Sequence, residues 1–278
     1  MTALAGRTIL ITGSTAGLGL EVARRLVSAG ATVLVHGRDP GRLERALVAV
    51  GGGRRDGRVH GLLADLASLD ATRRLARDVA VEFGRPDVLV NNAGVASISG
   101  PRRESAEGYE LTFAVNYLAG FLLTLELLPA LRAAASARVV NIASIGQAPI
   151  DLDDLMLERA YDGNRAYARS KLAQVMFTFE LAERLVAAGE PGVTVNALHP
   201  ATLMDTAMVR GTLGRPRSTV AEGAEATLRL IAAPELERVS GRYFDGVDES
   251  AADPQAYDRD ARRRLWALSE ELTGTRFG

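Results

Sequence analysis

Short apolar runs alternate with longer amphipathic segments along the whole chain. The short runs are rich in β-branched residues and lack a polar face, which is typical of strands buried on both sides. They predict strands over residues 7–12, 31–36, 58–63, 87–90, 138–142, 193–198 and 241–244. The longer segments repeat apolar residues at helical spacing. They predict helices over residues 20–29, 43–50, 69–83, 106–131, 163–188, 221–232 and 256–272.

This alternation predicts an α/β protein with a doubly wound parallel sheet, the Rossmann fold, of about seven strands with helices on both faces. A chain of 278 residues is long enough for one large domain. No linker divides it, so residues 1–278 are expected to form a single domain. Residues 201–219, rich in Gly, Thr, Arg and Pro, are a candidate mobile substrate lid, with a disordered surface loop as the alternative.

Composition and charge narrow the class of protein. The net charge of -1 argues against a general nucleic-acid or acidic-membrane surface, which needs a basic excess. No uninterrupted apolar run approaches the roughly 18 residues of a membrane helix, so no membrane segment is expected. The chain has no cysteine, which excludes disulfides and fits a cytoplasmic location. His36, His60 and His199 are too scattered in the sequence to predict a metal site.

A glycine-rich turn over residues 12–19 lies between the first predicted strand and the first predicted helix. Its G-x-x-x-G-x-G spacing allows the backbone to turn tightly and to approach a pyrophosphate at the helix N-terminus. It therefore predicts a dinucleotide-binding turn, with a plain glycine-rich connector as the alternative. The coenzyme-binding residues expected here are Gly13, Ser14, Thr15, Gly17, Leu18 and Gly19.

The end of the second predicted strand bears on the choice of coenzyme. An acidic residue there binds the ribose 2′-hydroxyl of NAD, whereas an arginine accommodates the 2′-phosphate of NADP. Gly37 stands where the acid is expected and Arg38 follows it, which favours NADP(H) and leaves NAD(H) as the alternative. Asp39 offers Arg38 a competing role as its ion-pair partner.

Polar residues also follow the third and fourth predicted strands. Asp65, followed by Leu66, stands where a carboxylate could accept a hydrogen bond from the adenine amino group. The alternative for Asp65 is a helix N-cap, a role for which Ser68 is better suited. The N-N-A-G tetrapeptide after the fourth strand suits close backbone contact with a ligand, or a plain turn. The residues expected to contact the coenzyme in that tetrapeptide are Asn91, Ala93 and Gly94.

A tyrosine and a lysine lie four residues apart on the helix predicted over residues 163–188. Lys171 is the only lysine in the chain, and it follows Tyr167 at a spacing that places both on one helix face. A neighbouring ammonium group lowers the pKa of a phenol, which would make Tyr167 a general acid or base. A surface pair on an amphipathic helix is the alternative.

Together these motifs resemble the short-chain dehydrogenase/reductase family. The glycine turn, the N-N-A-G tetrapeptide, Asn116, Ser144 and the Y-x-x-x-K pair occur in the order and at the approximate spacing of that family, over about residues 7–206. The stretch between Ser144 and Tyr167 is similar to that of the subgroup containing retinol-dehydrogenase-like and carbonyl-reductase-like enzymes.

The resemblance implies catalytic roles for four residues. Tyr167 would be the general acid in reduction and the base in oxidation, while Lys171 would hold the nicotinamide ribose and lower the pKa of Tyr167. Ser144 would hydrogen-bond the substrate oxygen, and Asn116 would keep a water molecule that links Lys171 to solvent. The alternatives are a turn residue for Ser144 and a helix-bend amide for Asn116.

The sequence departs from the family pattern after the sixth predicted strand. The tetrapeptide H-P-A-T stands where Pro-Gly is usual, and Asp205 replaces the threonine expected five residues after the proline. Pro200 and Thr202 remain the expected coenzyme contacts, with Thr206 as the alternative. His199 is expected to be a structural histidine at the end of the strand.

Substrate contacts are expected from residues 145–150 and 204–213, and from Tyr161 or Trp266. Several of these side chains are apolar, which favours a hydrophobic aldehyde or ketone. Three consecutive arginines at residues 262–264 are expected on a solvated helix face.

The expected function is that of an NADP-dependent oxidoreductase that interconverts a carbonyl and an alcohol by hydride transfer. Its partner would be a small molecule and not a nucleic acid. Epimerase or dehydratase chemistry on the same fold, and a non-enzymatic NADP-binding sensor or scaffold, are the alternatives. Family members often pack through two long helices, so a homodimer or homotetramer formed through residues 106–131 and 163–188 is also expected.

Overall fold

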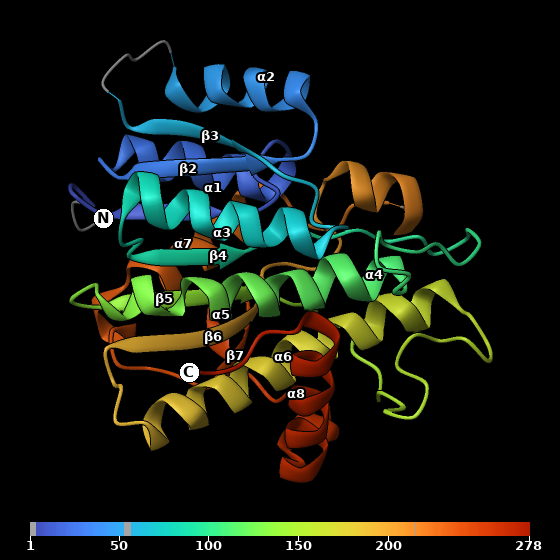
Figure 1. Ribbon diagram of the computed structural model, residues 1–278. Helices are drawn as coiled ribbons and strands as arrows, with labels where there is room; N and C mark the ends of the chain where they lie inside the picture. The colour runs from blue at the N-terminus through green and yellow to red at the C-terminus, as the bar shows by residue number, and fades with distance from the viewer. Residues whose placement is uncertain (1–3, 53–56, 214) are drawn as a thin grey trace.

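One sheet runs through the centre of the computed structural model, which describes residues 4–52, 57–213 and 215–278. Its strands are β1 (Thr8–Ile11), β2 (Thr32–Gly37), β3 (Val59–Leu63), β4 (Val88–Asn91), β5 (Ala137–Ile142), β6 (Val193–His199), β7 (Arg242–Asp245) and β8 (Asp248–Glu249). In space the order is β3-β2-β1-β4-β5-β6-β7-β8 (Figure 1). The first seven strands pair in parallel, and β8 pairs with β7 in the antiparallel direction.

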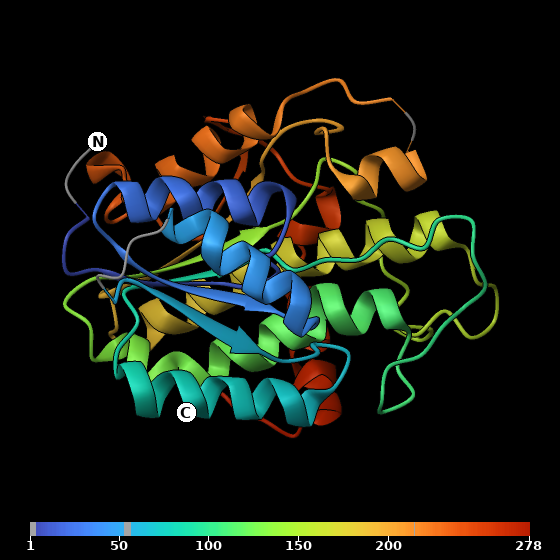
Figure 2. The same cartoon turned by 90° about the horizontal axis from the view of Figure 1, so that it is seen from above.

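Helices cover both faces of this sheet. They are α1 (Gly17–Ser28), α2 (Pro40–Gly51), α3 (Leu69–Phe83), α4 (Leu111–Phe113), α5 (Ala119–Arg132), α6 (Gly163–Ala187), α7 (Val220–Ala232) and α8 (Arg259–Thr273), with the π-helices η1 (Ala114–Leu118) and η2 (Val209–Leu213) and the 3-10 helices η3 (Pro234–Leu236) and η4 (Pro254–Tyr257). One apolar core joins the sheet to α3, α5, α6 and α8, and a second joins it to α1, α2 and α7. Figure 2 shows the sheet between α1 and α7 on one side and α3 and α5 on the other. The predicted doubly wound fold is confirmed.

The seven predicted strands are confirmed, each to within one residue at either end. These strands could be predicted because β4, β5 and β6, at the centre of the sheet, are buried at every position and are therefore mostly apolar. The short strand β8 escaped prediction, because its two residues are acidic and exposed and carry no apolar pattern.

The long helix predicted from residue 106 begins later, at Leu111. The Glu110 carboxylate ends the preceding turn and caps the helix, since it accepts hydrogen bonds from the amides of Thr112 (3.0 Å) and Phe113 (2.7 Å). The helix then passes through the π-turn η1, which contains Asn116. Such π-turns in helices occur frequently at functional sites.

Side chains cap most of the longer helices at their N-termini. The caps are Asp39 for α2, Ser68 for α3, Asp162 for α6, Thr219 for α7 and Asp258 for α8. The predicted cap at Ser68 is therefore confirmed. Helix α1 differs, because its N-cap residue Ala16 makes no side-chain hydrogen bond to the first turn. The amide groups at the start of α1 are consequently not satisfied by a capping side chain.

The C-terminal helix α8 packs on α6 through Trp266, which is 2 % exposed. The indole contacts the rings of Phe121 on α5 (5.1 Å between centroids) and Phe177 on α6 (5.8 Å), and the Arg184 guanidinium lies over it. The expectation that Trp266 contacts substrate is wrong, since the side chain fills the core between three helices.

Arg262 does not lie on the solvated helix face that was expected for residues 262–264. Arg263 and Arg264 are exposed as predicted, but Arg262 is 4 % exposed and lies between α8 and α6. Its guanidinium pairs with Glu180 (3.5 Å) and Glu183 (2.5 Å). Only one of three consecutive helical residues can point toward the neighbouring helix, and the run of identical residues conceals which one does.

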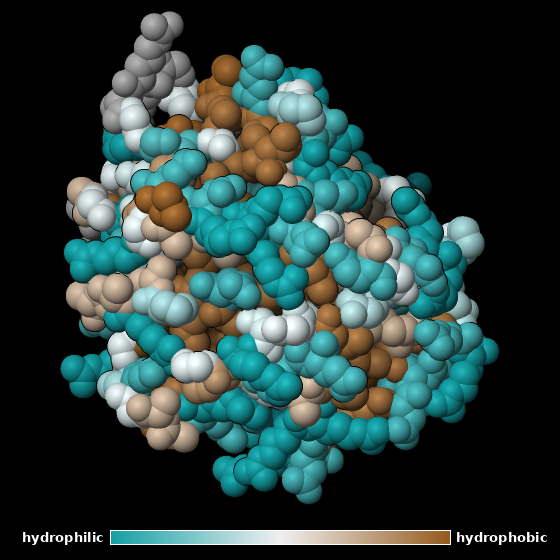
Figure 3. Space-filling model, viewed as in Figure 1, coloured by the Kyte–Doolittle hydropathy of each residue, from teal (hydrophilic) through white to brown (hydrophobic). Residues whose placement is uncertain are grey.

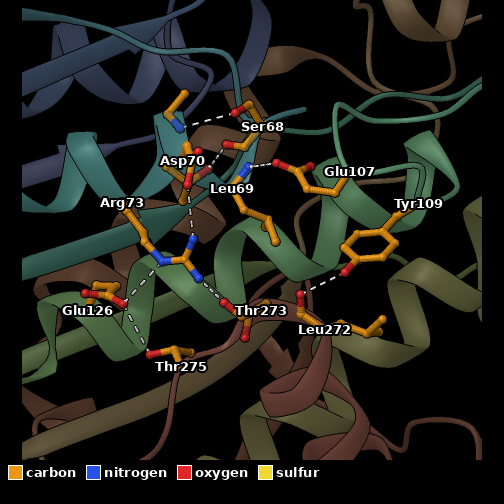
Figure 4. A network of polar contacts seen from close by, with 12 residues as sticks. Ser68, Leu69, Asp70, Arg73, Glu107, Tyr109, Glu126, Leu272, Thr273 and Thr275 are labelled. Atoms are coloured by element: carbon orange, nitrogen blue, oxygen red, sulfur yellow. Dashed lines mark hydrogen bonds and ion pairs between the residues drawn. The ribbon is translucent and has the colours of Figure 1, made fainter.

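The end of α8 is held by polar contacts from three other segments (Figure 4). Arg73 on α3 donates to the carbonyl of Thr273, Tyr109 donates to the carbonyl of Leu272 (2.9 Å), and Thr275 donates to Glu126 on α5 (3.3 Å). The first two contacts satisfy carbonyl groups at the helix end that lack partners within the helix, and the third ties the segment after the helix to α5.

Because α8 and η4 cover it, α6 is buried around most of its circumference. Polar residues such as Gln174 and Glu180 are buried on it together with the apolar ones. Part of the helix surface that was expected to join subunits is therefore occupied by the chain's own C-terminal helix. The homodimer or homotetramer stays a prediction.

The surface is largely polar on the face that carries α3 and α5, with apolar side chains in separate patches (Figure 3). Within the described residues, one helical stretch, Leu111–Arg132, is long and apolar enough to cross a membrane by length and composition. In the fold, 83% of its most apolar window is buried. A buried core helix passes the same test, so this stretch is weak evidence for a membrane span.

We expect Trp266→Ala to lower the free energy of unfolding by about 3–5 kcal/mol, because it leaves a large cavity between α5, α6 and α8. Urea unfolding followed by circular dichroism measures the change. Arg263→Ala, on the exposed side of the same helix, is the matched control and should change stability by less than about 0.5 kcal/mol. Equal effects of the two substitutions would contradict the packing described for α8.

Candidate active site

A cavity of about 800 Å³ opens at the carboxyl ends of the parallel strands. It lies where the strand order reverses between β1 and β4, the place where sheets of this topology bind ligands. The structure brings most of the predicted site residues to its wall. They are Gly13, Thr15, Gly17, Leu18, Gly19, Arg38, Asp65, Leu66, Ala93, Gly94, Ser144, Tyr167, Lys171, Pro200 and Thr202.

Three predicted site residues do not line this cavity: Ser14, Asn91 and Asn116. The Ser14 hydroxyl is fully buried and donates to the carbonyl of Ile11 (2.8 Å), so it shapes the turn from within. Asn91 lies inside the sheet, where its amide donates to Asn141 (2.9 Å). Their side chains hold the frame of the site together.

Several residues of the wall were not among those predicted from the sequence. Arg42 lies in the first turn of α2, four residues after Arg38, which precedes the helix. A second arginine so soon after Arg38 was the signal that could have found it. Val95 and Ile98 come from the loop after β4, and Asn164 comes from the first turn of α6. The sequence carries no local signal for these three, because only the fold brings their segments together.

The glycine turn fits tightly against its neighbours. A Cβ atom on Gly13 would lie 2.8 Å from the Cα atom of Ala93, and one on Gly19 would lie 2.6 Å from the side-chain nitrogen of Asn92. Gly13 and Gly17 also have positive φ angles, of 63° and 55°. Glycine is therefore required here for the path of the backbone, and the uncapped start of α1 faces the cavity behind it.

The end of β2 explains why Gly37 carries no side chain. A Cβ atom at this position would lie 2.4 Å from the methyl group of Thr15. Arg38 is exposed at the rim of the cavity. The Asp39 carboxylate caps α2 by accepting from the amide of Arg42 (2.7 Å), and no ion pair joins Arg38 to Asp39 among the described residues.

Asp65 has features of both roles expected from the sequence, a contact with the coenzyme and a hydrogen bond at the start of a helix. It lines the cavity, and its carboxylate accepts a hydrogen bond from the amide of Ala67 (3.0 Å). Ser68 caps α3, as expected. The carboxylate is exposed, so one helix-turn contact does not exhaust its capacity to accept hydrogen bonds.

The loop after β5 places Ser144 at the cavity. Two donors fix its backbone, since Tyr243 (3.0 Å) and Gln147 (2.9 Å) both donate to the carbonyl of Ser144. The Ser144 hydroxyl accepts from the amide of Gly146 (3.0 Å). An accepting hydroxyl keeps its own hydrogen available for another oxygen atom.

Tyr167 and Lys171 share one face of α6, as predicted, with 5.6 Å between the Lys171 Nζ atom and the centre of the Tyr167 ring. Lys171 is 4 % exposed, which excludes the surface-pair alternative. Its Nζ atom donates to the carbonyl of Ile142 (2.8 Å) and to Gln174 (3.0 Å). A Cβ atom at Gly94 would lie 3.7 Å from Nζ, so the glycine leaves space beside the ammonium group.

The pKa of Tyr167 does not follow the expected direction. Burial raises the pKa of the phenol, and a hydrogen bond with Ser144 opposes this shift. Lys171 is itself desolvated, which lowers its pKa from 10.5 to about 7. A lysine with that pKa carries only part of its charge near neutral pH, so it favours the phenolate less than a fully charged ammonium group would.

Asn116 matches the helix-bend interpretation in its side-chain contacts. Its amide nitrogen donates to the carbonyl of Val95 (3.1 Å) and to Ser170 (2.9 Å), and its oxygen accepts from the amide of Val95 (2.7 Å). The side chain thus ties the loop after β4 to the π-turn η1 and to α6. The water-holding role of Asn116 stays a prediction.

His199 is buried at the end of β6, as expected of a structural histidine. Its Nε2 atom lies 3.1 Å from the Thr202 hydroxyl, so Thr202 already has a partner within the protein. The methyl group of Thr206 lies against the glycine turn, 3.3 Å from the position of a Cβ atom on Gly17. Among the described residues, no three metal-binding side chains come together to form a metal site.

Neither Tyr161 nor Trp266 lines the cavity, so the substrate contacts expected of them are wrong. Residues 145 and 146 and several residues between 204 and 209 do line it, as expected, whereas residues 147–150 do not. The apolar part of the wall consists of Val95, Ile98, Val115, Ile142, Ile145, Leu203, Met204, Met208 and Val209.

Comparison with known sequences gives a consistent match. A family model described as short chain dehydrogenase matches residues 7–214. Retinol dehydrogenase 13 of Mus musculus is 39% identical over 286 residues, which cover 97% of this chain and 84% of that protein.

Solved structures match over most of the chain. An uncharacterised protein from Mycobacterium paratuberculosis has a TM-score of 0.84 and 32% identity, covering 100% of this chain and 97% of that one. A short chain dehydrogenase from Escherichia coli in complex with NADPH has a TM-score of 0.72 and 26% identity, covering 88% of this chain and 98% of that one.

The lowered pKa of Lys171 predicts how stability depends on pH. The unfolded chain holds the Lys171 proton up to about pH 10.5, whereas the folded chain releases it near pH 7. The folded state is therefore penalised below pH 7, and this penalty disappears as the pH rises to about 10. Relative to Lys171→Met, the wild-type chain should gain up to about 1.4 kcal/mol per pH unit in this range. Urea unfolding of both proteins at pH 7, 8 and 9 measures the difference, and a constant difference would contradict the shifted pKa.

Proposed function

The chain belongs to the short-chain dehydrogenase family, and from this premise we propose that it interconverts a carbonyl and an alcohol by hydride transfer, with NADP(H) as coenzyme. The observation that carries the proposal is the meeting of Ser144, Tyr167 and Lys171 on the cavity that the glycine turn also lines. A nucleotide-binding protein without catalysis would need the turn but not these three side chains.

The glycine turn and the start of α1 would hold the coenzyme diphosphate. Backbone amides at an uncapped helix N-terminus bind anions, and the helix dipole adds to the attraction. The absence of a cap at Ala16, in contrast to the capped helices α2, α3, α6, α7 and α8, supports this role. The similar Escherichia coli structure was solved with NADPH, which supports the choice of a nicotinamide coenzyme.

Two arginines support a preference for the 2′-phosphate of NADP. Arg38 and Arg42 lie at the same end of the cavity as Asp65, and Arg38 is not paired with Asp39. Guanidinium groups bind phosphate in a bidentate manner. The contact between Thr15 and Gly37 also leaves no room at position 37 for the acidic side chain that typically selects NAD.

Proton transfer at the substrate oxygen would belong to Tyr167. When bound, the coenzyme supplies the hydride for reduction or accepts it for oxidation. Burial raises the pKa of the Tyr167 phenol, so the group holds its proton and can give it to a carbonyl oxygen. Ser144, hydrogen-bonded to Tyr167, would donate its hydroxyl hydrogen to the same substrate oxygen. These two groups would therefore set the position of the reacting oxygen.

Lys171 would hold the ribose hydroxyl groups next to the nicotinamide and return a proton to Tyr167. Its ammonium group has two fixed acceptors, the Ile142 carbonyl and Gln174, and an open side toward Gly94. A pKa of about 7 allows it to both release and take up a proton near neutral pH. Pro200, Thr202 and Thr206 remain candidates for contacts with the nicotinamide, and the Thr202 hydroxyl is also hydrogen-bonded to His199.

A hydrophobic aldehyde or alcohol fits the substrate end of the cavity. The apolar wall there includes Val95, Ile98, Ile145 and Met208. The relative from Mus musculus is named for retinol, which is a hydrophobic alcohol. The identity of the substrate and the cytoplasmic location stay predictions.

Residues 201–219 would act as the substrate lid. Residue 214 lies outside the described residues, and the rest of the segment is more ordered than its composition suggested, because it contains η2 and a bridge between Met204 and Ser218. The Arg210 guanidinium binds both oxygens of Asp205 (2.6 and 2.7 Å). The segment reaches the cavity with residues between 201 and 209, so its movement would open and close the substrate end.

The central test is Tyr167→Phe. We expect turnover to fall by about 10²–10⁴-fold because the proton donor is lost, while the dissociation constant for NADPH changes little. NADPH oxidation with a panel of hydrophobic aldehydes gives the rate, and fluorescence titration gives the affinity. Tyr161→Phe, a tyrosine outside the cavity, is the matched control and should leave both values unchanged.

The same measurements separate the alternatives. Carbonyl-dependent consumption of NADPH is not expected of an epimerase or dehydratase, which regenerates its coenzyme, or of a sensor, which turns nothing over. Retained activity in Tyr167→Phe would remove the role proposed for Tyr167.

Coenzyme preference has its own test. Arg42→Ala and Arg38→Ala should each raise the dissociation constant for NADPH by about 10–100-fold, because a charge-assisted contact with phosphate is lost. Binding of NADH, which lacks the 2′-phosphate, should be nearly unaffected. Arg45→Ala on the exposed face of α2 is the control. Equal losses for NADPH and NADH would contradict phosphate recognition by these arginines.

A further inference from the structure

We propose that His36 is a positioning residue of the coenzyme site, and that its imidazole ring locks the glycine turn to the segment after β3. This proposal rests on the proposed function, because it concerns the binding of the same coenzyme. His36 lies on β2 and is 3 % exposed. It has no role in the hydride and proton transfers proposed above.

The two ring nitrogens of His36 contact two different segments. The Nδ1 atom accepts a hydrogen bond from the amide of Gly13 in the glycine turn (3.0 Å). The Nε2 atom lies 3.1 Å from the carbonyl oxygen of Ala64, at the end of β3. One planar ring therefore spans the distance between the proposed diphosphate turn and the loop that carries Asp65.

These partners fix the protonation state of the ring. The Gly13 amide can only donate, so Nδ1 is unprotonated, and the Ala64 carbonyl can only accept, so Nε2 carries the hydrogen. The ring is therefore neutral. Burial supports this assignment, since it lowers the pKa of His36 to about 4 against the opposite influence of the Ala64 carbonyl and Asp65.

Backbone contacts strengthen the same junction. The amide of Ser14 donates to the carbonyl of His36 (2.9 Å), and the amide of His36 donates to the Ser14 hydroxyl (3.0 Å). From the other side, the side-chain nitrogen of Asn92 donates to the carbonyl of Gly13 (3.1 Å). Both polar groups of the Gly13 backbone are thus bound to protein, and the amides that remain for a diphosphate come from later in the turn.

This arrangement predicts an effect on coenzyme affinity and not on the reaction itself. The ring lies at the nucleotide end of the cavity, with Arg38 and Asp65, and away from Tyr167. Because the ring keeps the glycine turn in position for the coenzyme diphosphate, replacing His36 should weaken NADPH binding. The rate at saturating NADPH should change little, because the reacting groups are placed by β5 and α6.

A matched pair of substitutions separates the two contacts. In His36→Asn, the side-chain oxygen can take the place of Nδ1 and accept from Gly13. In His36→Gln, the side-chain nitrogen can take the place of Nε2 and donate to Ala64, while the acceptor for Gly13 is lost. His60 on β3 provides the control pair His60→Asn and His60→Gln. Its ring is hydrogen-bonded to the nearby carbonyl of Gly57 and packs against Phe83 (4.8 Å between centroids), and it does not line the cavity.

The experiment measures the dissociation constant for NADPH by fluorescence titration, the rate at saturating NADPH with one aldehyde, and the melting temperature of each variant. We expect His36→Gln to raise the dissociation constant at least tenfold and His36→Asn to raise it less than threefold. Both should keep the saturated rate within threefold of wild type. The His60 variants should match wild type in NADPH affinity and in saturated rate, while their melting temperatures report the loss of the ring contact with Phe83.

Other results would overturn the proposal. If both His36 variants melt earlier but bind NADPH like wild type, the ring has a structural role only. If the saturated rate falls while the dissociation constant is unchanged, the ring acts on the reaction and not on binding. If the wild-type protein itself does not bind NADPH, the proposed coenzyme is wrong, which is a distinct failure from that of His36.

Discussion

The reversal of strand order between β1 and β4 is the constraint on which the site depends. Chain crossovers run from β1 through β2 to β3 in one direction, and from β4 through β5 and β6 to β7 in the other. Right-handed crossovers then place α1 and α2 on one face and α3, α5 and α6 on the other. The loops after β1 and β4 diverge at this point, and the opening between them is the beginning of the cavity.

Polar groups inside the sheet connect this opening to the core. Asn91 donates to Asn141, Asn141 donates to Thr178 (2.8 Å), and Thr178 donates to the carbonyl of Gln174 (2.8 Å), whose side chain accepts from Lys171. This line of contacts joins β4, β5 and α6 beneath the cavity. Buried polar groups are costly when unpaired, so a connected series fixes one arrangement of these elements. The desolvated ammonium of Lys171 at one end has two acceptors, the Ile142 carbonyl and Gln174. At the other end, the side-chain oxygen of Asn91 has no hydrogen-bond partner among the described residues.

Much of the fold and of the candidate site could be predicted from the sequence, for physical reasons. Strands buried on both faces leave an apolar run that needs no tertiary information, and the glycine turn and the Tyr167–Lys171 pair are local motifs whose geometry follows from short spacings. The burial of Trp266 and Arg262 could not be predicted, because no local sequence pattern shows that α8 packs on α6. The pKa of Tyr167 was misjudged because a sequence shows the neighbouring charge but not the burial of both groups. His36 went unnoticed as a coupling residue, since its two partners lie 23 and 28 residues away.

The hydrogen bond from Tyr243 to the carbonyl of Ser144 has a consequence for how the protein is made. Tyr243 lies on β7, and Gln255, which holds the loop over residues 145–150 through both the amide and the carbonyl of Ile150, lies further on still. The ribosome must therefore complete nearly the whole chain before Ser144 is fixed in place, although Ser144 itself is synthesised near the midpoint. At about 5–20 residues per second, the 111 residues from Ser144 to Gln255 take about 6–22 seconds to synthesise. In a nascent chain of this protein, the glycine turn is therefore synthesised well before the residues that fix Ser144.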